Sequence, residues 1–180
     1  MTHNPALARE RRVALVRDLG ILDTPPEQSF DLVAQGLARV YQVPVAMVTF
    51  LDQDRQFIKA VAGTDARHRP LTETFCQHTL SSDSVLVIPD LIEDDRGQHH
   101  PLVTGPPHVR FYAGAPILVD GVHVGTLCIF DLMPRTLSPQ QVDGLAQLAR
   151  MVAITVQARR YGPAILLEAP RSTAKQNPDR

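Results

Sequence analysis

The sequence predicts an α+β fold in which helices cover an antiparallel β-sheet. Two apolar runs meet at Asp120-Gly121, which is the two-residue signal of a tight β-hairpin. Both faces of that hairpin are too apolar to meet water, so we expect the sheet to be covered on both sides. Amphipathic helix patterns lie near both ends of the chain and can supply part of that cover.

Length and composition limit the function classes. The chain has 180 residues, of which 44% are hydrophobic, which suits one domain with a substantial core. A net charge of −1 and the absence of Trp argue against nucleic acid or an anionic membrane as a partner. No apolar run approaches the roughly 20 residues needed to cross a bilayer, and the start of the chain is no signal peptide. Two cysteines indicate a reducing compartment, so we expect a cytoplasmic protein.

Two helices are expected before the first strand. The first covers about Leu7 to Leu19 and ends at Gly20. The second is predicted to begin at Thr24 as N-cap, with Glu27 completing a capping box. Its apolar residues recur every three or four positions, which predicts one buried face: Phe30, Val33, Leu37 and Tyr41.

Three strands are expected before the hairpin, at Val45–Leu51, Gln56–Ala62 and Val85–Ile88. The periodicity decays over residues 63–107, where Thr74–Leu80 is predicted to form a helical turn. So long a connection inside a compact domain is usually functional or disordered. We therefore expect the binding site there.

The hairpin over residues 110–131 is predicted to pair around its Asp120-Gly121 turn. The pairing places Val119 opposite Val122, Phe111 opposite Phe130 and Arg110 opposite Asp131. One face then forms a packed layer made of Phe111, Ala113, Ala115, Ile117, Val119, Val122, Val124, Thr126, Cys128 and Phe130. The other face carries Tyr112, Gly114, Pro116, Leu118, His123, Gly125, Leu127 and Ile129.

The middle of this second face is almost bare of side chains at Gly114, Pro116 and Gly125. Glycine inside a strand marks a place where other groups come close. A closely packed helix or loop would satisfy this, and so would a small ligand. Tyr112 could then offer its hydroxyl group at the end of such a cavity.

The last helix is predicted to begin at a capping box formed by Ser138 and Gln141. Its apolar stripe runs to about Arg160 and suits either burial on the sheet or a two-helix dimer contact. Residues 1–8 are expected to be a flexible start, 9–160 a single domain and 161–180 a disordered tail.

Several motifs stand in the order found in one family: GILDTPPE, DRQFIKA, TFCQHT, RFYAGAPI, GTLCIFD and PRTLS. With these motifs the chain resembles the GAF family of sensory domains over about residues 9–160. The resemblance implies an α/β sandwich with a central antiparallel sheet of five to six strands. It also implies N- and C-terminal helices on one face and a small-molecule pocket on the other. Relatives often precede histidine kinases or diguanylate cyclases. We expect here a stand-alone module that acts on a signalling partner in trans.

The candidate ligand-binding residues lie around that pocket: Cys76, His78, Asp90, Asp95, Arg96, Arg110, Tyr112, Gly114 and Gly125. Arg110 could hold a carboxylate or phosphate, or pair with Asp131. Asp90 could instead cap a turn. The chain departs from the GAF domains that share these motifs over residues 95–103, where His100 stands in place of an Asn at the presumed pocket rim.

Cys76 and His78 are too few for a metal site, and no metal or other cofactor is expected. Cys76 as a redox thiol would need a positive neighbour, and a buried residue lining the pocket is the simpler interpretation. Cys128 is expected to be structural, on the packed face. His99 and His100, after two aspartates, fit a solvated loop better than a metal site.

The sequence contains no phosphate loop, nucleophile elbow or zinc-protease motif. We therefore expect a non-catalytic, small-molecule-sensing module, dimeric through its terminal helices. One alternative is a redox enzyme of the free methionine-(R)-sulfoxide reductase type that uses Cys76. Another is a structural dimerisation module whose pocket is filled by its own side chains.

Overall fold

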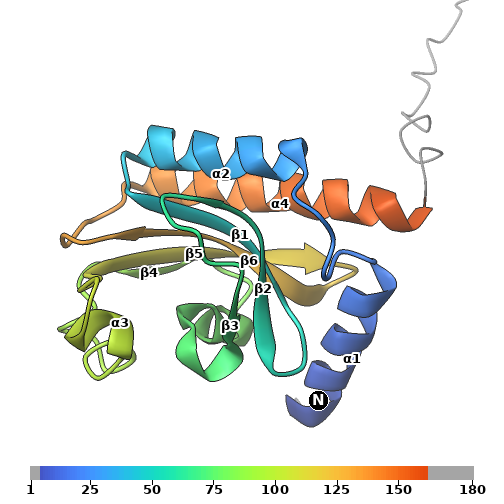
Figure 1. Cartoon of the computed structure of the whole chain (residues 1–180), viewed down its shortest axis with the longest axis horizontal. Helices are drawn as coiled ribbons and strands as arrows, with labels where there is room; N and C mark the ends of the chain where they lie inside the picture. The colour runs from blue at the N-terminus through green and yellow to red at the C-terminus, as the bar shows by residue number, and fades with distance from the viewer. Residues whose placement is uncertain (1–4, 162–180) are drawn as a thin grey trace, which may run out of the picture.

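The computed structural model describes residues 5–161. Their six strands form one antiparallel sheet with the order β3-β2-β1-β6-β5-β4. Helices α2 and α4 lie side by side on one face, and short helical turns cover the other (Figure 1). The predicted α+β fold is confirmed. The strands are β1 Val45–Leu51, β2 Arg55–Ala62, β3 His68–Pro70, β4 Leu86–Ile88, β5 Phe111–Val119 and β6 Val122–Asp131. The helices are α1 Pro5–Asp18, α2 Gln28–Tyr41, α3 Pro101–Thr104 and α4 Pro139–Tyr161, with 3₁₀ turns η1 Leu71–Glu73 and η2 Phe75–Ser81.

The main core lies between the sheet and the pair α2 and α4. Both helices present an apolar stripe to it, as their periodicity predicts. The buried stripe of α2 is Phe30, Ala34, Leu37 and Tyr41, and that of α4 includes Leu145, Ala149, Val152 and Val156. Burial of each large apolar side chain contributes about 2 kcal/mol, so this layer supplies much of the stability of the fold.

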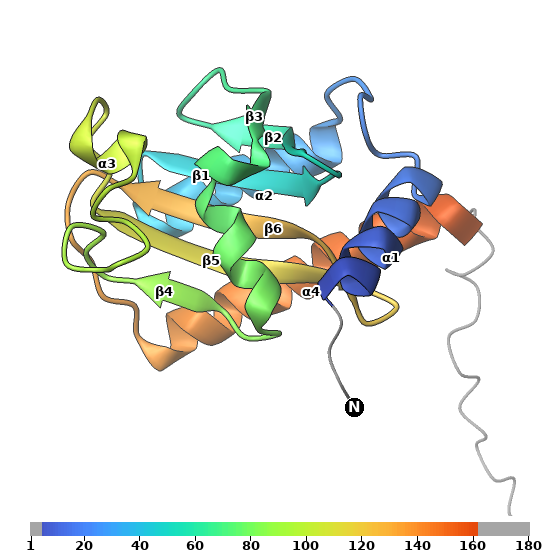
Figure 2. The same ribbon diagram turned by 90° about the horizontal axis from the view of Figure 1, so that it is seen from below.

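Helix α1 lies at the end of the sheet, where it contacts β1 and β6 (Figures 1 and 2). Val16 of this helix and Leu19, just after its end, are buried in the main core. The helix begins at Pro5 and so includes part of the start that was expected to be flexible. Residues 1–4 and the expected disordered tail, apart from Tyr161 at the end of α4, lie outside the described residues.

One predicted helix start is confirmed and the other is wrong. The capping box of α4 is present: the backbone N of Ser138 donates to Gln141 Oε1 at 2.8 Å, and the backbone N of Gln141 donates to Ser138 Oγ at 3.2 Å. Helix α2 starts at Gln28 rather than after Thr24. The reason is a tertiary contact, because the ammonium group of Lys59 binds Thr24 Oγ1 and the carbonyl oxygen of Pro25, each at 2.6 Å.

The hairpin turn is as predicted, but the register beyond it is not. Asp120 and Gly121 both have positive φ, at 51° and 71°, and Val119 pairs with Val122. Leu118 then pairs with His123 and Ile117 with Gly125, so Val124 is left as an extra residue in a β-bulge. Beyond the bulge every pair is displaced by one from the predicted pairing. Phe111, for example, pairs with Asp131 instead of Phe130.

The bulge decides which side chains of β6 face which layer. Leu127 and Ile129 belong to the core under the helices, and they were expected on the opposite face. Cys128 and Phe130 instead pack in the second apolar cluster, on the other face of the sheet. The prediction that Cys128 lies on the packed helical face is therefore wrong.

Candidate functional site

The face of the sheet opposite α2 and α4 is covered by the irregular segment between β2 and β5. Turn η2 crosses the middle of this face over β5 and β6 (Figure 2). Beneath it lies the second apolar cluster, whose buried members are Met47, Leu51, Ile58, Phe75, Cys76, Ile88, Leu91, Val103, Val109, Tyr112 and Cys128. Three motifs that are far apart in the sequence, TFCQHT, RFYAGAPI and GTLCIFD, meet here.

A buried polar cluster surrounds Cys76. Nε2 of Gln56 donates a hydrogen bond to Cys76 Sγ at 2.9 Å, and Tyr112 Oη lies 3.6 Å from the same sulfur. Cys128 Sγ lies 3.8 Å from it and Thr49 Oγ1 3.9 Å. Cys76, Tyr112 and Cys128 are at most 1% exposed. The two cysteines therefore form a buried, reduced pair of thiols.

A hydroxyl pair fixes η2 to the sheet next to these thiols. Oγ1 of Thr79 lies 2.9 Å from Oγ1 of Thr126, and Thr79 also donates to the carbonyl oxygen of Cys76 at 2.6 Å. Both threonines are buried. This pair supports the backbone that carries Cys76.

The environment shifts the pKa values of Cys76, Cys128 and Tyr112 in different directions. The hydrogen bond from Cys128 lowers the pKa of Cys76, and burial opposes this effect without cancelling it. Burial raises the pKa of Cys128 and that of Tyr112 well above their usual values. The lowered pKa of Cys76 favours its thiolate form, which is the nucleophilic form of cysteine.

The two strand glycines make room for protein and not for an open cavity beside them. A Cβ atom on Gly114 would lie 2.3 Å from the hydroxyl oxygen of Tyr112. A Cβ atom on Gly125 would lie 2.0 Å from the backbone carbonyl oxygen of Thr49 on β1. The expected bare patch is thus filled by Tyr112 and by the close approach of β1, and Gly125 does not face the pocket.

The cavity on this face lies farther along the sheet and has a volume of about 90 Å³. Its apolar wall includes Met47, Phe75, Val109 and Phe130. Its polar lining residues are Gln56, Arg69 and Glu73, together with two threonines. Because Gln56 and Phe75 also border the Cys76 cluster, the cavity and the thiols share a wall.

The acidic and basic candidates form pairs among themselves. Arg110 donates two hydrogen bonds to the carboxylate of Asp90, one of them from Nε at 2.8 Å. Asp90 also caps the backbone N of Ile92, as the alternative for this residue predicted. The predicted side-chain pairing of Arg110 with Asp131 is wrong. The bulge moves Asp131 opposite Phe111, and the carboxylate of Asp131 accepts a hydrogen bond from Arg135 instead.

Asp95 and Arg96 lie in the connection before α3. Arg96 forms an ion pair with Asp94 at 2.6 Å, and Asp95 accepts a hydrogen bond from Gln98 at 2.9 Å. Neither side chain lines the cavity. These contacts stabilise the loop itself.

The two histidines near the cover have different environments. His78 is electrostatically coupled to Arg96 and Asp94, and burial lowers its pKa. His100 stacks on Phe75 with ring centroids 4.2 Å apart, and its Nδ1 accepts a hydrogen bond from the backbone N of Leu102 at 3.1 Å. Within residues 5–161 no group of three or more His, Cys, Asp or Glu side chains is placed to hold a metal ion.

The sequence analysis predicted that Cys76, Tyr112 and Gly114 lie around one site. It did not predict that Gln56, Cys128 and Thr126 belong to the same site. The missed residues of β6 depend on the bulge at Val124. A signal for it was present, because a glycine inside a strand pattern indicates a bulge as well as a close contact. Gln56 carried no local signal.

Comparisons with known proteins agree on the fold. The model of the family described as GAF domain matches residues 25–156. A cyclic di-GMP phosphodiesterase of Pseudomonas aeruginosa is 33% identical over 151 residues, which are 83% of this chain. The chain spans about a quarter, 26%, of that relative.

Two solved structures show the same fold at low identity. The GAF domain of an Acinetobacter phosphoenolpyruvate-protein phosphotransferase has a TM-score of 0.63 and 15% identity, with 90% of this chain and 99% of that one covered. A free methionine-R-sulfoxide reductase of Neisseria meningitidis has a TM-score of 0.63 and 14% identity, with 89% and 95% covered. Within residues 5–161 we find no helix with the length and apolar character needed to cross a membrane.

Proposed function

This chain belongs to the GAF domain family, and we propose that it is the sensory module of a bacterial signalling protein and binds a small molecule on the covered face of its sheet. The observation that carries the proposal is the cavity of about 90 Å³ between the sheet and the segment 64–109. It combines an apolar wall with a few polar side chains, which is the usual composition of a ligand site.

The cavity also limits the ligand. Pockets for drug-sized ligands have volumes of about 300–1,000 Å³, so this one accepts either a very small molecule or a larger one that displaces the cover. The cover consists of η1, η2, α3 and the irregular connections between them, which are short elements with few backbone hydrogen bonds. We expect a ligand with an apolar body and one polar group that meets Gln56, Arg69 or Glu73.

Ligand binding would reach the rest of the protein through β5 and β6. These strands present Tyr112 and Cys128 to the covered face and Ala113 and Leu127 to the helices. A ligand that contacts the cover differently in two states shifts their populations by its difference in affinity. The output is a signalling partner, and the named activity of the longer Pseudomonas relative makes cyclic di-GMP turnover one candidate.

A screen with a matched variant pair tests ligand binding. We expect the melting temperature of the protein to rise with at least one class of metabolite. Val109→Phe fills the cavity and should abolish the rise, whereas Val40→Phe, on the exposed side of α2, should retain it. Leu102→Phe is a second blocking variant, in case Val109→Phe destabilises the fold.

A negative result in this screen would count against ligand binding. If no metabolite changes the melting temperature of wild type, and native mass spectrometry finds no molecule carried through purification, ligand sensing is contradicted. The alternative of a structural module with a self-filled pocket would then be favoured. Its support is that Tyr112 and Cys76 already occupy the face beside Gly114.

We propose further that the module is a homodimer through its long helices. Met151 and Ile154 of α4 are 63% and 59% exposed, and Leu32 of α2 is 59% exposed. Exposed apolar side chains on neighbouring helices fit a partner helix pair. Met151→Glu combined with Ile154→Glu should convert the dimer to a monomer in size-exclusion chromatography with light scattering. An unchanged mass would contradict this interface.

The buried thiol pair favours one second function, a thiol-dependent sulfoxide reductase. In that reaction the Cys76 thiolate attacks the sulfoxide sulfur and takes its oxygen as a sulfenic acid. Cys128 then displaces that oxygen as water and forms a disulfide, which an external dithiol must reduce. Both thiols are at most 1% exposed, so the substrate would have to open the cover. Turnover of methionine sulfoxide that is unchanged in Cys76→Ser would contradict this function.

A further inference from the structure

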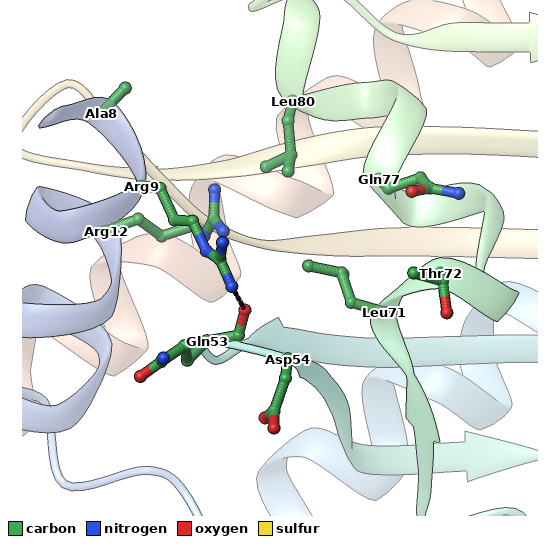
Figure 3. Close-up of a pocket in the computed structure, with 9 residues that line it drawn as sticks. All are labelled: Ala8, Arg9, Arg12, Gln53, Asp54, Leu71, Thr72, Gln77 and Leu80. Carbon is green, nitrogen blue, oxygen red and sulfur yellow. Dashed lines mark hydrogen bonds between the residues drawn. The ribbon is translucent and has the colours of Figure 1, made fainter. Parts of the chain in front are cut away.

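A second cleft, of about 460 Å³, lies at the end of the sheet where α1 faces the turn between β1 and β2. Figure 3 shows its walls, with α1 on one side and η1 and η2 on the other. Leu71 of η1 and Leu80 of η2 form the apolar part. The cleft shares no lining residue with the cavity on the covered face.

Arg12 is an unsatisfied cation in the wall of this cleft. Arg12 is only 8% exposed, and its Nε has no hydrogen-bond partner. It forms no ion pair within residues 5–161. Burial lowers the pKa of Arg12, and the nearby charge of Arg9 lowers it further. A buried guanidinium N–H without an acceptor is costly for the folded protein.

Arg9 adds a second cation beside Arg12. It is held in place by a hydrogen bond from its Nη2 to the backbone carbonyl oxygen of Gln53 at 2.7 Å. In Figure 3 the two guanidinium groups lie next to each other, and the carboxylate of Asp54 points away from them. Two neighbouring cations without a carboxylate between them form a favourable place for an anion.

We infer that this cleft binds a small organic oxyanion, a carboxylate or phosphate monoester with a short apolar body, through the guanidinium groups of Arg9 and Arg12. A planar guanidinium binds either oxyanion through paired hydrogen bonds. Leu71 and Leu80 then contact the apolar body. The cleft has the size of ordinary small-molecule sites.

The ligand would join two parts of the fold that are otherwise separate here. It contacts α1 through the arginines and the cover of the sheet through η2. The same turn presents Leu80 to this cleft and Cys76 to the covered face. An oxyanion bound here therefore stabilises the closed position of η2, in addition to any ligand in the cavity.

Isothermal titration calorimetry on the full chain, with hexanoate, hexyl phosphate and inorganic phosphate as probes, tests this site. We expect at least one alkyl probe to bind saturably and more tightly than inorganic phosphate, because only the alkyl probes reach Leu71 and Leu80. Arg12→Gln should weaken that binding at least about tenfold, since hydrogen bonds to a charged group are lost. Arg11→Gln removes the same charge from the exposed side of α1 and should leave the binding unchanged.

The comparison of the alkyl probes decides whether carboxylate or phosphate is preferred. Arg9→Gln changes an exposed residue and serves as a second variant should Arg12→Gln fail to fold. The absence of saturable binding by all three probes up to about 10 mM would overturn the site, since that limit is weaker than any regulatory affinity we consider. Equal affinities of Arg12→Gln and Arg11→Gln would also overturn it. Val109→Phe, which blocks the other cavity, should bind the probes normally, so the two proposals fail separately.

Discussion

The sulfur atoms of Cys76 and Cys128 lie 3.8 Å apart in the buried layer between η2 and β6. A disulfide bond requires about 2.05 Å, so the thiols are within reach of a bond after a small movement. The bulge in β6 creates this relationship, because it turns Cys128 toward Cys76. The pair connects the cover of the candidate site to the central sheet.

Oxidation should join this pair. With diamide, which accepts the two hydrogen atoms of the thiols, we expect one intramolecular disulfide in the folded protein. Intact-mass spectrometry should show the loss of two hydrogens, and Cys128→Ala should abolish it. Because both thiols are buried, the rate should increase in mild urea, which opens the cover. Two thiols that remain free after prolonged exposure would contradict the observed proximity.

The buried ammonium of Lys59 should make Glu27 important for stability. Nζ of Lys59 lies 2.6 Å from Glu27 Oε1, and the side chain of Lys59 is fully buried. Glu27→Gln should lower the free energy of unfolding by about 1–3 kcal/mol, less than for a fully buried pair because Glu27 is partly exposed. Urea unfolding at pH 7 measures this loss.

The same pair sets an acid dependence. Partial burial opposes ionisation of Glu27, but hydrogen bonds from Lys59 and Arg159 outweigh it, so its pKa is lowered in the folded state. Its stabilising contribution is therefore present above the ordinary pKa of about 4.3 and lost as the pH falls through the lower folded value. Stability in Glu27→Gln should fall less steeply below about pH 4.3 than in wild type. Equal slopes would contradict this role.

His100 should make the cover sensitive to mild acid. Burial lowers its pKa, with a smaller contribution from Arg69, while Glu73 on the facing turn opposes the shift. The unfolded chain thus binds the proton more readily, and stability should decrease as the pH falls from about 6.5 toward the lower folded pKa. Protonation also removes the Nδ1 acceptor that caps α3.

Hydrogen exchange at pH 7 and pH 5.5 measures this effect. The backbone N–H groups of Leu102 and Val103 should exchange faster at the lower pH, after correction for intrinsic rates. His100→Gln should show a smaller pH effect. Because the pKa of His78 is also lowered by burial, His78→Gln is the control that separates the two histidines.

Gly125 should be required by the backbone of β1 and not by a ligand. An added Cβ would lie 2.0 Å from the carbonyl oxygen of Thr49, and backbone atoms cannot move away cheaply. Gly125→Ala should therefore destabilise the protein by about 2–4 kcal/mol. Gly36→Ala is the control: nothing lies within 4 Å of its added Cβ, and we expect a gain of about 0.5–1 kcal/mol in helix α2. A Gly125→Ala variant of wild-type stability would contradict this packing.

Local patterns predicted the elements well, because they depend on residues close in sequence. The Asp120-Gly121 turn and the capping box of Ser138 and Gln141 were both found where expected. The predicted start of helix α2 was wrong because the hydroxyl group of Thr24 accepts a hydrogen bond from Lys59, 35 residues away. The short strand β3 and helix α3 had no periodic signal, since three or four residues are too few to show one.

The sequence by itself determined the order of the longer helices and strands, the hairpin turn, the last helix and the resemblance to GAF domains. Only the tertiary structure decided the partners: Cys76 with Cys128 across 52 residues, Arg110 with Asp90 across 20, and Tyr112 beside Gly114. The physical reason is that one extra residue at Val124 reverses every side chain of β6 beyond it. Such a bulge costs little locally, and its consequences appear only when both faces of the sheet are packed.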